Sequence, residues 1–157
     1  MLKIPKTLSL HLSIAICVIL FFVCIAGAFI MPALVDMLVD LPDNIGNRGD
    51  ITQTGRSLVL ILSYFILLCV LVADWLMFAL LHRVKAGQVF TDQSVSLIRG
   101  VSWCCFLLGM AFCGLGIYFQ LSFLVAFAAV FLGMCLRVVK NTIEEATQIK
   151  SENDLTV

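Results

Sequence analysis

Four long apolar stretches, separated by short polar breaks, fill most of this 157-residue chain. They cover residues 8–35, 58–81, 101–119 and 121–139. A helix rises about 1.5 Å per residue and the hydrocarbon layer of a membrane is about 30 Å thick, so one crossing needs about 20 apolar residues. Each stretch meets or nearly meets that length. The pattern predicts an integral membrane protein that crosses the bilayer with all four stretches.

Helices are the expected form of all four stretches, because a segment in lipid has to satisfy its backbone hydrogen bonds internally. Strands of a membrane barrel would instead alternate apolar and polar residues. The composition, 62% hydrophobic and 13% charged, also lies far from that of soluble domains. The expected fold class is all-α: an integral membrane four-helix bundle with cytoplasmic helix extensions. Residues 1–157 form its single domain, with a cytoplasmic tail at 140–157.

Basic residues lie at the same end of every predicted span. They are Lys3, Lys6, Arg83, Lys85, Arg99, Arg137 and Lys140. Short basic loops stay on the cytoplasmic side of a membrane, whereas the loop at 36–56 is rich in aspartate. We therefore expect a multi-pass protein of the plasma (inner) membrane with both termini in the cytoplasm. The first stretch is too long for a cleaved signal peptide and is expected to be a retained span.

Signals for helix ends mark the loop between the second and third stretches. Gly87 follows a turn that contains Lys85, which is typical of a glycine C-cap with cations in the last helical turn. Thr91 stands before Asp92 as an N-cap residue. We expect the third helix to begin at about Asp92 and to end at about Tyr118, with Phe90 packed between the two caps.

The last two stretches are joined by only a few residues around Gln120, which predicts an antiparallel hairpin. Pairs of small residues four apart, Gly109 with Cys113 and Ala129 with Gly133, are expected in the hairpin interface, where small side chains let membrane helices approach closely. After residue 139 the chain becomes polar without a helix breaker. Apolar residues recur there at helical spacing, so the fourth helix is expected to continue into the cytoplasm.

Two motifs carry a family resemblance. The first is Lys85-Ala86-Gly87-Gln88-Val89-Phe90-Thr91, followed by Val95 and Leu97-Ile98-Arg99, and the second is the ending at residues 149–157, IKSENDLTV. The chain resembles the bacterial four-span membrane proteins catalogued as domain of unknown function 2975. The resemblance implies a bacterial plasma-membrane protein with no established activity, and a small cytosolic helix-turn-helix regulator as a protein partner.

Asp74 is the one ionisable residue deep inside a predicted span, roughly 12 Å from its inner boundary at His82. Intramembrane acids often mark proton or cation paths, so one interpretation is an ion relay. The structural alternative is a protonated Asp74 that is hydrogen-bonded to Ser, Tyr or backbone groups of a neighbouring helix. The neighbouring Trp75 is expected to face lipid.

Other residue types that often carry chemistry lack the required spacing. The chain has seven cysteines, all in apolar stretches and none in a Cys-x-x-Cys pair, which favours packing over redox or zinc chemistry. His11 and His82 are expected to lie at the membrane boundary. Asp36, Asp40 and Asp43 are expected to be solvated, with a divalent-cation site as the alternative. No catalytic triad, metalloprotease motif or phosphate loop is present, so neither an enzyme nor a cofactor is expected.

The sequence leaves three functional hypotheses. The first is a non-enzymatic regulatory or sensory membrane protein that docks an intracellular partner, and the alternative is a small transporter or channel component that uses Asp74. The third is a membrane enzyme with an uncatalogued site. A homo-oligomer is compatible with the first two, and the zero net charge gives no reason to expect direct contact with nucleic acid. The candidate docking residues are Lys85, Gly87, Phe90, Thr91, Arg99, Ser151, Glu152, Asn153 and Asp154.

Overall fold

The computed structural model describes residues 6–40, 53–87 and 91–154. These residues form four helices: α1 (Lys6–Val39), α2 (Gln53–Lys85), α3 (Asp92–Leu115) and α4 (Leu121–Asp154). Each helix is long and apolar enough to cross a membrane, and each extends beyond the apolar stretch that predicted it at one end or both. The described part of the chain contains no strand, and the expected all-α membrane fold is confirmed.

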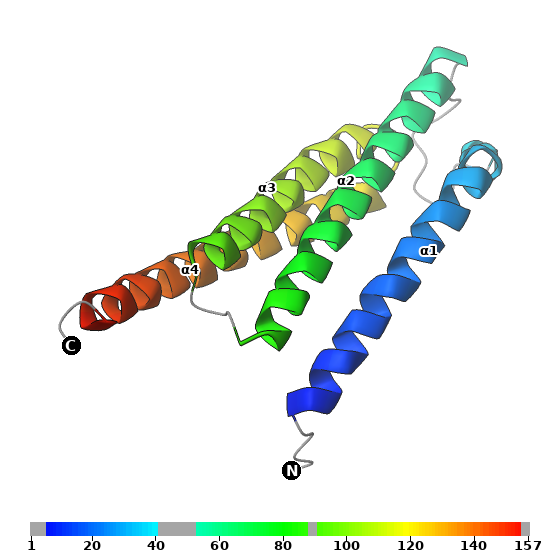
Figure 1. The fold of residues 1–157 in the computed structure, drawn as a ribbon. Helices are drawn as coiled ribbons and strands as arrows, with labels where there is room; N and C mark the ends of the chain where they lie inside the picture. Colours follow the sequence, from blue (N-terminus) through cyan, green and yellow to red (C-terminus); the bar gives the residue numbers. More distant parts are fainter. Residues whose placement is uncertain (1–5, 41–52, 88–90, 155–157) are drawn as a thin grey trace, which may run out of the picture.

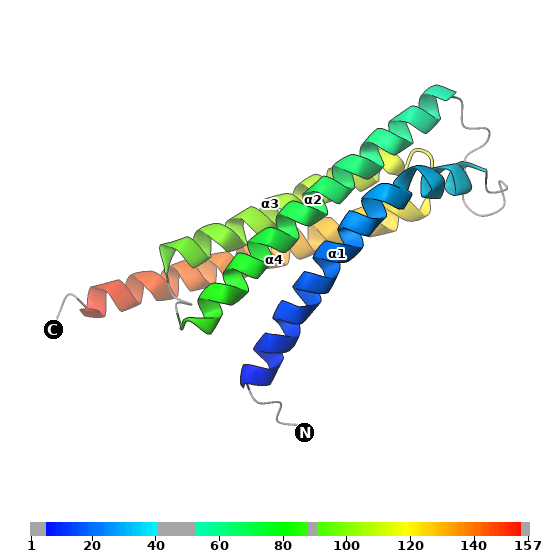
Figure 2. The ribbon, with the colours of Figure 1, turned by 45° about the vertical axis from the view of Figure 1, so that its right-hand side comes forward.

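Consecutive helices run antiparallel and pack on one another in chain order (Figure 1). Among the described residues, α1 packs on α2, α2 on α3 and α3 on α4. The start of α1, the end of α2, the start of α3 and the end of α4 therefore lie at the same end of the molecule, which we call the terminal end. Both views show α1 and α4 pointing apart there (Figures 1 and 2).

The two predicted helix caps at the terminal end are confirmed. Gly87 adopts a positive φ of 75°, which glycine tolerates best, and its amide donates to the Val84 carbonyl at 3.1 Å. Thr91 is extended, with φ −140°, and its hydroxyl oxygen accepts the Ser94 amide at 3.3 Å. Phe90 lies outside the described residues.

The α3–α4 connection comes slightly earlier than predicted. Helix α3 ends at Leu115, and Gly116 begins a tight turn in which the Phe119 amide donates to the Leu115 carbonyl at 2.9 Å. A Cβ at Gly116 would lie 2.8 Å from the Phe123 ring, so the ring of the returning helix occupies the space beside the glycine. The predicted continuation of α4 past residue 139 is confirmed by an unbroken helix to Asp154.

Small residues bring α3 and α4 together, as the sequence predicted for Gly109 and Gly133. A Cβ at Gly109 would lie 2.5 Å from a methyl group of Val130, and one at Gly133 would lie 3.2 Å from the Cβ of Cys105. Ser102 is buried in the same interface and donates its hydroxyl to the Gly133 carbonyl at 2.9 Å. Cys113, the predicted partner of Gly109 on its face, is exposed instead.

A proline inside α1 determines one contact between α1 and α2. Pro32 has no amide hydrogen, so the Ala28 carbonyl, four residues earlier, loses its helical donor. The Tyr64 hydroxyl of α2 donates to this carbonyl at 3.1 Å. Neighbouring side chains commonly satisfy carbonyls that a proline frees inside a membrane. Tyr64 therefore allows α1 to continue through Pro32 to Val39.

Replacing Tyr64 by phenylalanine is expected to lower the free energy of unfolding by about 0.6 to 1.7 kcal/mol, the range found for hydrogen bonds between membrane helices. The reason is that the Ala28 carbonyl would then have no donor. Unfolding in mixed micelles measures the change. In a Pro32→Ala background the amide of residue 32 supplies the donor, so Tyr64→Phe should lower the free energy of unfolding much less. An equal decrease in both backgrounds would contradict this explanation.

The end of the molecule opposite the termini contains an apolar cluster. Val35 of α1, Val59 of α2 and Leu115 of α3 are buried together there. Beside them Arg56 of α2 forms an ion pair with Asp36 of α1, and both side chains are partly exposed. This end of the molecule fixes α1, α2 and α3 relative to one another.

Candidate functional sites

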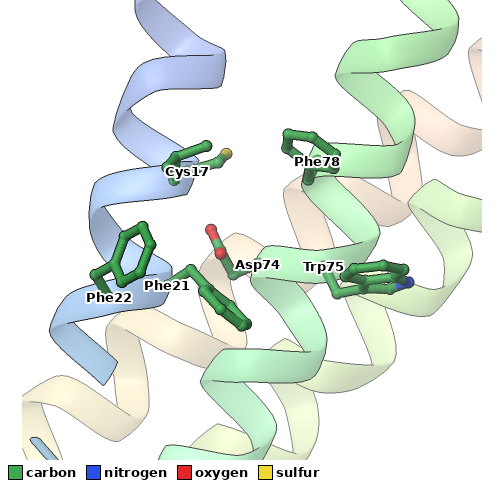
Figure 3. A pocket seen from close by; sticks show the side chains of 7 residues that line it. Cys17, Phe21, Phe22, Asp74, Trp75 and Phe78 are labelled. Carbon is green, nitrogen blue, oxygen red and sulfur yellow. The ribbon is translucent and has the colours of Figure 1, made fainter. Parts of the chain in front are cut away.

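Asp74 lies inside the α1–α2 interface. Asp74 is 9% exposed, and its carboxylate points from α2 toward α1, where Cys17 lies (Figure 3). The Asp74 and Cys17 side chains share a hydrogen bond. Cys24, two turns further along α1, is buried on the same face. The structural alternative predicted a hydroxyl or backbone partner for Asp74. The partner found among the described residues is a thiol, which is a weak hydrogen-bond donor.

Two pockets meet at Asp74. One has a volume of about 220 Å³ and is lined by Cys17 and Asp74 together with aromatic side chains of α1 and α2 (Figure 3). The other has a volume of about 420 Å³ and includes Ser13, Cys17 and Asp74. The carboxylate and the thiol thus belong to both pockets. A molecule that lies between α1 and α2 at this depth would meet both groups.

The predicted metal alternatives gain no support from the described residues. No group of three His, Cys, Asp or Glu side chains comes together there in a way that could hold a metal ion. Asp36 instead pairs with Arg56, and Asp43 lies outside the described residues. His82 lines a separate pocket of about 510 Å³ near the terminal end.

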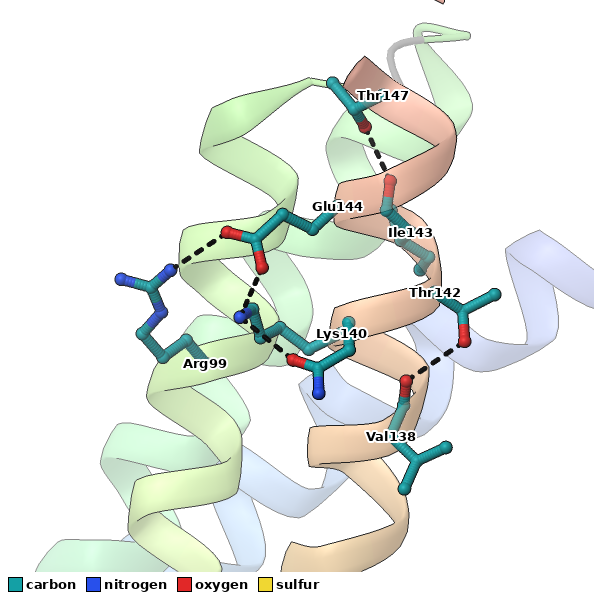
Figure 4. A network of polar contacts seen from close by, with 8 residues as sticks. Arg99, Val138, Lys140, Thr142, Ile143, Glu144 and Thr147 are labelled. Atoms are coloured by element: carbon teal, nitrogen blue, oxygen red, sulfur yellow. Dashed lines mark hydrogen bonds and ion pairs between the residues drawn. The ribbon is translucent and has the colours of Figure 1, made fainter. Parts of the chain in front are cut away.

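A second polar cluster joins α3 to α4 near the terminal end. Arg99 of α3 donates to a carboxylate oxygen of Glu144 at 3.4 Å, and Lys140 of α4 contacts the other oxygen at 2.5 Å (Figure 4). Lys140 also donates to Asn141 at 3.1 Å. One turn before Lys140, the Arg137 guanidinium lies 5.4 Å from the centre of the Trp103 ring on α3. These contacts hold the polar parts of α3 and α4 side by side.

The predicted docking residues fall into three groups. Lys85 and Gly87 are exposed at the end of α2, whereas Thr91 caps α3 and Arg99 pairs with Glu144. Ser151, Glu152, Asn153 and Asp154 form the last helical turn of α4, and their side chains lie outside the described residues, as does Phe90. The structure thus gives Thr91 and Arg99 a role within the fold.

The pKa of Glu144 depends on the Arg99–Glu144–Lys140 cluster. The hydrogen bond from Lys140, helped by the charge of Arg99, lowers this pKa from its ordinary value of 4.5. A lowered carboxyl pKa stabilises the folded state above the unfolded pKa, and the contribution is lost as pH falls through the folded pKa. The cluster therefore contributes at neutral pH and not in acid.

We expect Glu144→Gln to lower the melting temperature slightly at neutral pH, and we expect this difference to disappear as the pH falls through the lowered folded pKa of Glu144, because the wild-type carboxylate is then protonated as well. Circular dichroism of the protein in detergent measures both values. Glu145→Gln is the matched control, because Glu145 is exposed next to Glu144. If Glu144→Gln lowered the melting temperature as much in acid as at neutral pH, the charge of Glu144 would not be involved.

Sequence reasoning missed the two pairings that define these sites. The Cys17–Asp74 and Arg99–Glu144 contacts join residues on different helices, and their formation depends on how each helix is rotated about its axis. One signal was available for the first pair, because Cys17 and Cys24 lie seven residues apart and share a helix face. For the second pair, a short hairpin already predicts that residues near the start of α3 face residues near the end of α4.

Comparison with known proteins gives one result. A family model described as "Protein of unknown function (DUF2975)" matches residues 42–157 of the chain, which include α2, α3 and α4. Neither the curated proteins nor the solved structures contain a match. The residues of the matched region include Asp74 and the Arg99–Glu144 cluster, whereas Cys17 lies before it.

Proposed function

This chain belongs to the DUF2975 family of proteins of unknown function, and we propose that it is a non-enzymatic regulatory or sensory protein of the bacterial plasma membrane. In this proposal the terminal end of the molecule lies in the cytoplasm and binds an intracellular protein. The observation that carries the proposal is the hairpin of α3 and α4, which continues as paired polar helices beyond the apolar stretches. A helix pair of this kind offers a rigid surface outside the lipid.

Helix α4 supports the proposal by its length. Gly116 lies beside Phe123 and Gly109 beside Val130, so in this antiparallel pair the start of α3 is level with about residue 147. The last seven or so residues of α4 then lie past the start of α3, which at about 1.5 Å per residue corresponds to about 10 Å. The red end of α4 extends past α3 in Figure 1. This projecting turn contains Ser151–Asp154, four of the predicted docking residues.

Charge also supports an interaction at the terminal end. Lys85 is exposed at the end of α2, and the final turns of α4 contain Glu152 and Asp154. Basic and acidic groups at one end of the molecule suit a protein surface better than a nucleic acid, which requires a mainly basic face. A small helix-turn-helix regulator is the partner class that the family resemblance implies.

Affinity capture from native membranes tests the docking proposal. The intact chain is expected to retain an intracellular protein that a chain lacking Ser151–Val157 loses. Asp40→Ala, at the opposite end of the molecule, is the matched control and should retain the partner. If the shortened chain captures the same proteins as the intact chain, the tail does not dock a partner.

A transporter or channel component is the second candidate, and the buried Asp74 between two pockets favours it. The two candidates differ in which substitution abolishes function in the cell. Docking predicts that removal of Ser151–Val157 abolishes function and that Asp74→Ala does not. Transport predicts the reverse.

A further inference from the structure

The smaller pocket at Asp74 combines one carboxylate with several aromatic rings. Phe78 and Phe21 lie on either side of the carboxylate in Figure 3, and Phe22 and Trp75 complete the lining. Aromatic faces carry negative charge density and attract cations within about 6 Å, and a quaternary ammonium group is the ligand that sets of such rings recognise. The walls of the pocket and the carboxylate therefore favour the same type of ligand.

The carboxylate of Asp74 has no positively charged partner within the described residues. The ion pairs found there join Arg56 to Asp36 and Arg99 and Lys140 to Glu144, and none of these residues lines the pocket. Within the described residues, Asp74 interacts with the neutral thiols of Cys17 and Cys24 on α1. An acid buried in a membrane protein is costly without a compensating charge, and a bound cation would supply that charge.

The position of the pocket indicates the route by which a ligand enters. Phe22 is 64% exposed and Trp75 is 67% exposed, and both lie on the surface of helices that are apolar enough to cross a membrane. A molecule reaches the pocket sideways from the lipid, between α1 and α2. A hydrated metal ion does not travel by that route, whereas an organic cation with an apolar body dissolves in the bilayer.

We propose that the pocket between α1 and α2 binds a small lipophilic organic cation, of the aryl-substituted quaternary ammonium class. Its volume of about 220 Å³ suits a compact ligand, since drug-sized ligands occupy pockets of about 300 Å³ or more. Asp74 pairs with the cationic nitrogen, and Phe21 and Phe78 contact its substituents. This site does not depend on the docking proposal, because it lies in the span and not at the terminal end.

Benzyltrimethylammonium is the probe, and its binding to the full-length protein in detergent micelles is measured by equilibrium dialysis. We expect one saturable site, and the Kd should rise at least tenfold in Asp74→Asn, which keeps the shape of the side chain. Asp40→Asn removes a carboxylate outside the pocket and should leave the Kd unchanged. Phe78→Leu should raise the Kd about threefold to tenfold, because it removes one aromatic face.

Neopentylbenzene, the uncharged carbon analogue of the probe, makes the test independent of any folding defect in the variants. It should compete for the wild-type site at least tenfold more weakly than the cation does. Absence of saturable binding, equal competition by the neutral analogue, or an unchanged Kd in a folded Asp74→Asn protein would each overturn the proposal.

Discussion

Gly109→Val is expected to lower the free energy of unfolding by about 3 kcal/mol, at the upper end of the range for overpacked sites. A Cβ at this position would lie 2.5 Å from Cγ2 of Val130 and 3.4 Å from the carbonyl oxygen of Ala126. Val130 is β-branched and restricted to few rotamers, and Ala126 contributes backbone, so neither neighbour moves aside easily. The two helices would have to separate, and the Ser102 hydrogen bond to Gly133 would lengthen.

Alanine substitutions at two helical glycines provide the matched comparison. Gly109→Ala should destabilise the protein by about 1 to 3 kcal/mol, less any gain in helix propensity. Gly27 of α1 has its nearest neighbour, a Leu67 methyl group, at an ordinary 3.7 Å, so Gly27→Ala should be neutral or slightly stabilising. Reversible unfolding in mixed micelles measures all three variants. Equal effects at positions 27 and 109 would mean that α3 and α4 do not meet at Gly109.

Asp74→Leu is expected to raise the free energy of unfolding by about 2 kcal/mol, within the cost of about 1–3 kcal/mol that proteins bear for burying a poorly hydrogen-bonded polar group. The side chain is buried, and the hydrogen-bond partner found for it among the described residues is the Cys17 thiol, a weak donor that compensates little of the cost of burial. A residue that lowers stability in this way is typical of a functional site. The same variant should lose binding of benzyltrimethylammonium.

Two outcomes distinguish the roles of Asp74. A more stable Asp74→Leu protein that no longer binds the cation would support a functional role, whereas a less stable one would show that the Asp74–Cys17 pair holds α1 and α2 together. Trp75→Leu is the control for lipid-facing substitutions and should change stability by less than about 0.5 kcal/mol, because Trp75 is largely exposed on the helix surface.

Much of the fold could be predicted because it depends on signals close together in the sequence. The apolar stretches predicted the helices, and the Gly87 and Thr91 caps followed from local chemistry that needs no partner helix. Gly109 and Gly133 were predicted in the right interface, since a short connection makes α3 and α4 adjacent. Trp75 was predicted to face lipid, in agreement with its exposure.

Contacts between helices far apart in the chain could not be predicted, because they depend on helix rotation and spacing. The sequence places Pro32 but does not say which side chain satisfies the Ala28 carbonyl, and Tyr64 is 36 residues away from it. Likewise a lone Asp74 requires a partner, yet a thiol on α1 was not among the expected partners. Local sequence determines approximately where each helix begins and ends, whereas the packing of the helices determines which side chains meet between them.

We expect the chain to cross the membrane four times and to leave both of its ends on the same side. Topology reporters fused before α1, between α1 and α2, and after residue 157 measure this directly in cells. We predict cytoplasmic signals from the first and last fusions and an external signal from the fusion between α1 and α2. A reporter after residue 157 that is active outside the cell, or an α1–α2 fusion that reports from the cytoplasm, would contradict the account.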